Sequence, residues 1–259
     1  MPEAFPTIVQ DFGYSPIAPA LWRTDTASGL VERDLSLDQA SHQVLLGQHL
    51  RAAGVVTQSD SLISADAPFV FLFVLAGRVT LAHDGGVAQL NQLDAATRYG
   101  TGGSVTLGLS QDAEIILMQG ASGADEAFGR GGNGEWTFSI EDEDVYISGD
   151  GPRKFFKYRD LGVADATQRR IHIHIVRATE PSESGGTGWH SHSMGQLFYV
   201  LRGWADLAVQ NRPSVRMLTG DAMCLGARMK HDVPAFSRDY LVLEMCIPAD
   251  YDTVDTVAD

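Results

Sequence analysis

Short runs of apolar residues, each bounded by glycine or polar residues, recur along the whole chain. The segment IHIHIV at 171–176 alternates with a period of two, which is typical of a β-strand. The runs at 71–77, 197–203 and 240–247 are rich in aromatic and β-branched residues, and the first two end at a glycine. Because few segments show a helical period, the pattern predicts an all-β protein of small antiparallel barrels or jelly rolls.

The chain also repeats itself at an offset of 126 residues. When 33–82 is aligned with 159–208, eleven positions are identical, whereas chance would supply roughly three. Two tandem copies of one barrel are therefore expected. We predict an N-terminal barrel at 1–125, a connecting segment at 126–152 and a C-terminal barrel at 153–259. The exact start of the second barrel, between about 136 and 155, is left open by the pattern.

Composition and charge restrict the function. The chain has 259 residues, of which 44% are hydrophobic, and its formal net charge is −14. A surface this acidic repels phosphate groups, so nucleic acid and membranes are not expected as partners. The longest apolar run, 69–76, is too short for a membrane helix. With two cysteines and no signal-peptide pattern at the start, we expect a cytoplasmic protein, monomeric or homodimeric, with a small-molecule substrate.

Three histidines and a glutamine suggest a metal site in the second copy. His190 and His192 are two residues apart, so their imidazoles share one face of a strand. Gln196 follows four residues after His192, and His231 comes after a returning strand. Three imidazoles and one side-chain oxygen facing inward would form half a shell around a divalent transition metal, with positions left open for substrate or oxygen.

These residues resemble the two metal-binding motifs of the cupin superfamily, and the repeat makes the whole chain resemble a bicupin. In the first motif, G-x5-H-x-H-x3/4-E-x6-G, Gln196 replaces the glutamate and the first glycine stands one residue closer. The second motif, G-x5-P-x-G-x2-H-x3-N, keeps its first glycine and its histidine. The matching positions are Gly185, His190, His192, Gln196 and Gly203 in the first motif, and Gly220 and His231 in the second.

The resemblance implies two tandem double-stranded β-helix (jelly-roll) barrels. It also implies one divalent transition metal (iron, manganese, nickel, zinc or copper), held by His190, His192, Gln196 and His231. In the first copy the repeat places Ser64, Asp66 and Val70 at the positions of His190, His192 and Gln196. A lone carboxylate does not hold a transition metal tightly. We therefore expect the first barrel to bind no metal.

The neutral glutamine suggests which substrates the site would take. Gln196 leaves the full 2+ charge of a metal, which attracts an anionic chelator such as an enolate, a catecholate or a 2-oxo acid. The leading hypothesis is a dioxygenase-like metalloenzyme acting on a small, oxygen-chelating, enolisable or catechol-like substrate. Two alternatives stay open: a redox-neutral, metal-dependent isomerase or lyase acting on a sugar acid, and a non-catalytic ligand-binding cupin.

Four further residues are candidates for the substrate pocket. Phe198 and Val200 share strand parity with Gln196 and are expected to form an apolar wall. Arg228 precedes His231 and is a candidate for steering an anionic substrate. Glu244 is a general-base candidate if its face of the last strand points inward, and a solvated residue otherwise.

A second H-x-H pair, His172 and His174, lies outside the motif. No side-chain oxygen follows this pair at the motif's spacing, so we expect a polar strand face rather than metal ligands. The isoleucines that alternate with the pair should face the opposite side of the strand.

Overall fold

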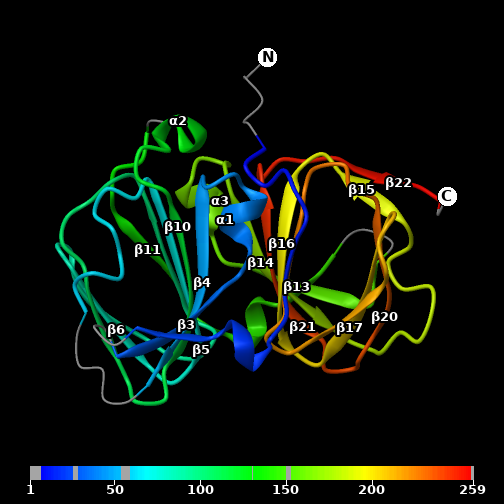
Figure 1. Ribbon diagram of the computed structural model, residues 1–259, viewed down its shortest axis with the longest axis horizontal. Coiled ribbons are helices and arrows are strands. Elements are labelled where there is room, and N and C mark those ends of the chain that lie inside the picture. Colours follow the sequence, from blue (N-terminus) through cyan, green and yellow to red (C-terminus); the bar gives the residue numbers. More distant parts are fainter. Residues whose placement is uncertain (1–6, 26–28, 54–58, 130, 150–152, 258–259) are drawn as a thin grey trace.

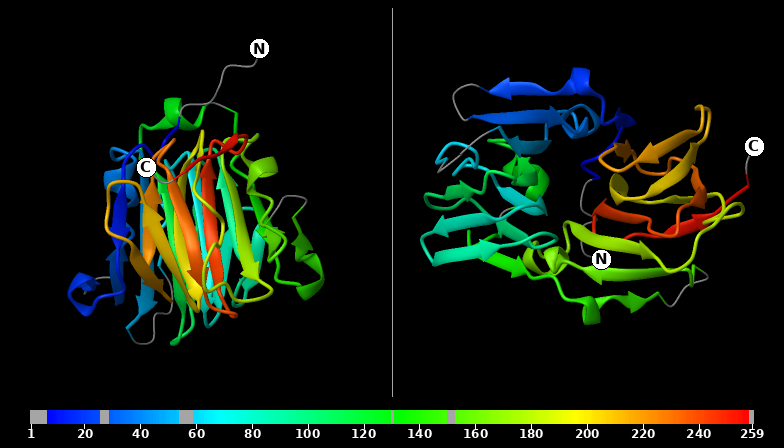
Figure 2. Two further views of the ribbon diagram at one scale, coloured as in Figure 1. Left: turned by 90° about the vertical axis from the view of Figure 1, so that its right-hand side faces the viewer. Right: turned by 90° about the horizontal axis from the view of Figure 1, so that it is seen from below.

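The computed structural model describes residues 7–25, 29–53, 59–129, 131–149 and 153–257. These residues form two β-barrels side by side (Figure 1), and the view from below separates the two rings of strands (Figure 2). All strand pairs between named strands are antiparallel, which confirms the predicted all-β fold of two tandem jelly-roll barrels. The helices among the described residues span at most four residues, so none of them could cross a membrane.

The first barrel consists of a seven-stranded sheet and a three-stranded sheet. In spatial order the large sheet contains β11 (Trp136–Ser139), β8 (Ala95–Tyr99), β5 (Phe69–Ala76), β10 (Glu114–Gly120), β4 (Leu45–Ala52), β3 (Leu30–Asp34) and β2 (Arg23–Asp25). The small sheet contains β7 (Gly86–Leu90), β6 (Val79–His83) and β9 (Thr106–Leu109). The short helices η1 (Pro19–Leu21), α1 (Leu37–Ala40) and α2 (Asp125–Phe128) lie between strands.

The second barrel repeats this plan with a seven-stranded and a five-stranded sheet. The large sheet contains β1 (Gly13–Ser15), β19 (Ala222–Leu225), β16 (Gly195–Arg202), β21 (Leu241–Ile247), β14 (His172–Ala178), β13 (Phe156–Asp160) and β12 (Ile147–Ser148). The smaller sheet contains β18 (Val215–Leu218), β17 (Trp204–Val209), β20 (His231–Phe236), β15 (His190–His192) and β22 (Thr253–Asp255). The helices η2 (Glu143–Val145) and α3 (Val163–Ala166) complete the described elements.

The barrels exchange edge strands, so the predicted division of the chain at 125 and 153 does not match the sheets. Strand β1, near the N-terminus, pairs with β19 of the second barrel. Strand β11, in the predicted connecting segment, pairs with β8 of the first barrel. Each exchange covers an open sheet edge with backbone hydrogen bonds, which depend little on side-chain identity. A hydrophobic pattern therefore gives no sign of it.

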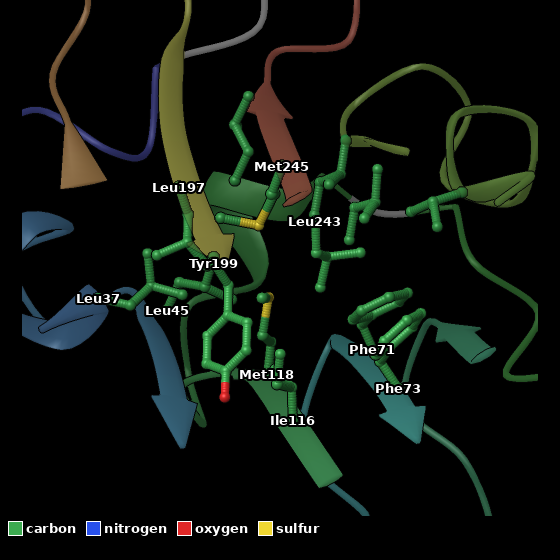
Figure 3. Packing of buried hydrophobic residues seen from close by; sticks show 14 of the residues in the cluster. Leu37, Leu45, Phe71, Phe73, Ile116, Met118, Leu197, Tyr199, Leu243 and Met245 are labelled. Atoms are coloured by element: carbon green, nitrogen blue, oxygen red, sulfur yellow. The ribbon is translucent and has the colours of Figure 1, made fainter. Parts of the chain in front are cut away.

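The two large sheets pack face to face, and their strands are buried on both sides. In β5, Phe71 and Phe73 point into the layer between the barrels, while Leu72 and Val74 point into the first barrel. Figure 3 shows side chains from both barrels meeting in this layer. The isoleucines of β14 belong to the same layer, so they face away from His172 and His174 as the alternation predicted. The inward faces of the central strands thus line a barrel interior.

Two buried arginines at equivalent places in the repeat link the barrels. Arg33 donates a 2.8 Å hydrogen bond to the carbonyl of Ser15 in β1 and another to the carbonyl of Gly220 in the turn between β18 and β19, both in the second barrel. Arg159, 126 positions later, donates a 2.8 Å hydrogen bond to the carbonyl of Leu93 in the first barrel. Each barrel therefore reaches into the other through the same arginine, which explains why this position recurs in both copies.

The layer between the barrels should contribute strongly to stability. Ile173 is fully buried in it, so Ile173→Ala should lower the free energy of unfolding by about 2–5 kcal/mol, because the substitution leaves a cavity that rigid sheets cannot close. Urea unfolding monitored by circular dichroism would measure the change. Val87→Ala, at a position that is 68% exposed, is the control. An Ile173→Ala protein as stable as this control would contradict the packing described here.

Candidate metal centre

Three imidazoles converge inside the second barrel. His190 and His192 come from β15, and His231 from the neighbouring β20, where it is the direct register partner of His190. All three side chains are buried, and one nitrogen of each lies within 4.8 Å of the others. In the described part of the chain this is the one group of three histidine, cysteine, aspartate or glutamate side chains close enough to share an ion. The sequence spacing thus predicted a real spatial cluster.

Each imidazole is held from behind by a hydrogen bond at Nδ1. For His190 and His231 the partner is a backbone carbonyl, which can only accept, so Nδ1 carries the proton and Nε2 keeps a free lone pair. Hydrogen bonds of this kind orient histidines that bind metals. The partners are the Gly188 carbonyl at 2.6 Å for His190, the Met229 carbonyl at 3.0 Å for His231, and Thr253 Oγ1 at 2.9 Å for His192.

Burial also prepares the imidazoles for a cation. It lowers the pKa of His190, that of His192 to about 4 and that of His231 to about 3, so all three rings are neutral at pH 7. Only the neutral ring can donate a lone pair to a metal. Three neutral, oriented nitrogens around one point fit a divalent transition metal.

Gln196 lines the same pocket from β16, and its side chain is fixed by Glu244. Gln196 Nε2 donates a 2.6 Å hydrogen bond to Glu244 Oε1. Burial alone would raise the pKa of Glu244, but hydrogen bonds from His174 and Gln196 and the charge interactions with His174 and His192 lower it to about 2. An ionised carboxylate therefore stands behind Gln196. Its negative charge would offset part of the 2+ charge of a bound metal, which the sequence analysis left uncompensated.

The remaining predicted pocket residues are placed differently from one another. Phe198 and Glu244 line the pocket with the three imidazoles, so Glu244 points inward from β21. Val200 lies further along the same strand face, in the apolar core of the second barrel, and is not among the pocket-lining residues. Arg228 lines a separate surface hollow with Lys230, because its backbone turns there with a φ of 66° and its N–H donates to the His192 carbonyl.

Several pocket residues carry no sequence signal that could have identified them. Arg153 lies between β12 and β13, and Tyr251 and Thr253 come from the C-terminal segment that folds back beside β15. His174 was expected on a polar strand face, but it lines the pocket and hydrogen-bonds Glu244 at 2.9 Å. Neither His172 nor His174 belongs to the three-imidazole cluster.

The equivalent positions in the first barrel have a different character. Ser64 and Asp66 are exposed, and Val70 lies in the apolar cluster that fills that barrel. The buried guanidinium of Arg98 donates to the Ser64 carbonyl at 2.8 Å. The interior of the first barrel is thus packed with apolar side chains around the buried Arg98.

Comparison with known proteins establishes the fold. No family model and no curated protein matches the chain. Among solved structures, a candidate glyoxylate-induced protein from Pseudomonas aeruginosa superimposes with a TM-score of 0.68 at 13% identity, covering 100% of this chain and 95% of that one. The protein Ylba from E. coli gives 0.63 at 12%, covering 96% of both chains. Oxalate decarboxylase from Lactobacillus farciminis, solved with formate, gives 0.61 at 15%, covering 93% and 88%.

These neighbours are cupin-family proteins, and the chain has their jelly-roll fold in two tandem barrels. At identities of 12 to 15% the likeness defines the fold and leaves the activity open. The resemblance inferred from the histidine motif is thereby confirmed at the level of the fold.

Metal content should depend on His231. Protein purified without chelating resin should carry about one divalent transition metal per chain, and His231→Ala should lose it, because two imidazoles cannot replace three. Inductively coupled plasma mass spectrometry would measure both. His83→Ala, in the first barrel, is the control and should keep the metal. Full metal content in His231→Ala would contradict the proposed site.

The same imidazoles should make the metal-free protein sensitive to acid. Below about pH 6.5 the unfolded chain protonates these histidines, whereas the folded site, with its lowered pKa values, does not. Folded stability should therefore fall as pH drops from 7 to 5, by up to about 1.4 kcal/mol per pH unit for each histidine. Urea unfolding at both pH values tests this. In His231→Gln the free energy of unfolding should fall less steeply with pH than in the wild type. An equal slope in both proteins would contradict the lowered pKa of His231.

Proposed function

We propose that the protein is a metal-dependent enzyme that binds a small acid through its oxygen atoms and removes a proton from it. One observation carries this proposal: three neutral imidazoles and the ionised Glu244 line the same pocket. A bound divalent metal supplies Lewis acidity, which makes a proton next to a coordinated carbonyl easier to remove. Glu244 is the carboxylate positioned to accept that proton.

The size of the pocket restricts the substrate. The cavity has a volume of about 120 Å³, somewhat less than the roughly 150 Å³ cavity that accommodates benzene. A molecule of about six non-hydrogen atoms is therefore favoured. This supports a small 2-oxo or 2-hydroxy acid over the larger sugar acid of the alternative hypothesis.

Arg153 supports an anionic substrate. Its guanidinium lines the pocket and forms no ion pair with any described acidic residue. Nε is buried without a hydrogen-bond partner in the described part of the chain, and Nη2 makes one long contact, 3.4 Å, to the Thr187 carbonyl. A guanidinium without an ion-pair partner and with an unused N–H donor favours a carboxylate ligand. The role that the sequence suggested for Arg228 is thus assigned to Arg153.

The pocket also offers a substrate apolar walls and phenol groups. Phe198 and Val242 form apolar walls beside Glu244. Burial raises the pKa of Tyr240 and Tyr251, so both phenols in the pocket stay protonated. A substrate here would thus meet one base, one cation and neutral donors.

Two reaction classes follow from proton removal. In the first, the electron-rich substrate reacts with O2, which is the dioxygenase-like activity that we propose. In the second, the substrate is reprotonated or loses CO2 without O2. The likeness to oxalate decarboxylase keeps this redox-neutral class as the second candidate.

Turnover of small acids with the metal-loaded protein tests the proposal. A panel of small 2-oxo and 2-hydroxy acids should include a substrate whose consumption requires metal. An oxygen electrode would measure oxygen uptake, and mass spectrometry would identify the product. Oxygen uptake supports the dioxygenase, and turnover under nitrogen supports the redox-neutral enzyme. Arg153→Met should raise KM about tenfold or more, because a charged hydrogen bond to the substrate is lost.

Arg228→Met is the matched control, since Arg228 lies in a separate hollow and its removal should leave KM unchanged. Ligand-induced thermal stabilisation without product from any acid would contradict the enzyme proposal and favour a binding protein. A KM that changes with Arg228 but not with Arg153 would contradict the substrate orientation.

A further inference from the structure

A chain of hydrogen bonds runs across three adjacent strands of the second barrel and ends at Gln196. His172 Nε2 lies 2.6 Å from His174 Nδ1 on β14, and His174 Nε2 lies 2.9 Å from Glu244 Oε2 on β21. The other oxygen of Glu244 accepts the 2.6 Å hydrogen bond from Gln196 Nε2 on β16. The strand register makes this possible, because Glu244 is the direct partner of His174 on one side and of Phe198 on the other.

Each hydrogen bond to Glu244 has one direction. A carboxylate only accepts hydrogen bonds, so His174 must donate from Nε2 and Gln196 must present its amide nitrogen to Glu244. His174 Nδ1 makes the second hydrogen bond of this ring, with Nε2 of His172. The Gln196 oxygen is consequently turned away from Glu244.

This direction matters because an amide side chain is nearly symmetric in shape. A half-turn of its last torsion exchanges the oxygen, which can bind a metal, for the NH2 group, which cannot. In the described part of the chain the bond to Glu244 is the only hydrogen bond of the Gln196 side chain. Glu244 therefore decides which atom of Gln196 is available to a metal, and His174 holds the second oxygen of Glu244.

We infer that His174 is a positioning residue: acting through Glu244, it keeps the Gln196 oxygen available as the fourth protein ligand. The inference rests on the metal centre of the proposed function. It gives a role to one histidine of the H-x-H pair that lies outside the motif. Hydrogen-bonding partners of metal ligands typically change metal affinity by about 10- to 100-fold when they are removed.

Cobalt binding tests the inference without any substrate. Metal-free wild type, His174→Ala and His174→Gln would be titrated with Co²⁺, with affinity measured by competition against a chromophoric chelator and ligand geometry followed by visible absorption. His174→Ala should bind Co²⁺ at least about tenfold more weakly and with a changed spectrum. His174→Gln should approach wild type, because its amide can donate to Glu244. His42→Ala, at a surface histidine of the first barrel, is the control.

A double-substitution cycle separates positioning from general damage. If His174 acts through Gln196, adding His174→Ala to Gln196→Ala should cause little further loss of Co²⁺ affinity. An equal loss in both backgrounds would overturn the inference. So would a His174→Ala protein with wild-type affinity and spectrum, while the metal centre would stand. A wild-type protein that binds no Co²⁺ would instead overturn the proposed function itself. Thermal unfolding of every variant verifies the fold.

Discussion

The layer between the two large sheets is the constraint on which the rest of the structure depends. Because strands such as β5 and β16 are buried on both faces, the polar groups on these faces need partners within the protein. In the first barrel the inward face is filled with apolar side chains. In the second barrel the inward face carries Gln196, which finds its partner in Glu244 on the neighbouring strand. Of the four residues proposed as ligands, Gln196 thus comes from the doubly buried β16, whereas the three histidines come from β15 and β20 of the smaller sheet.

The distribution of charge is the second feature of the site. All the side chains that could contact a metal directly are neutral, since the pKa values of the three histidines are lowered and Gln196 has no charge. The negative charge stands one contact further away, on Glu244. A carboxylate in that place orients Gln196, and in the reaction that we propose it also accepts the proton of the substrate. Arg153 supplies the opposite charge at the same pocket and so favours an acid.

The two barrels show how one repeat can serve two purposes. The shared part of the repeat is structural: Arg33 and Arg159 each hydrogen-bond a carbonyl of the other barrel. The parts that differ are the inward-facing positions, where Val70 stands in one copy and Gln196 in the other. Packing between the barrels and the lining of the pocket therefore use opposite faces of the same strands.

The sequence by itself determined the all-β class and the two copies, and it identified the four residues proposed as ligands, because all of these can be recognised from residue patterns and spacings. Strand alternation and the H-x-H spacing depend on residues close in sequence. The 126-residue offset is found from identical residues at equivalent positions. Parity likewise separated the isoleucines of β14 from its histidines.

Only the tertiary structure decided the exchange of β1 and β11, the position of Arg153, and the inward turn of Glu244 towards His174 and Gln196. Each of these depends on which strand edges meet. The sequence of a strand does not determine which strand lies beside it or which of its two faces points into the barrel.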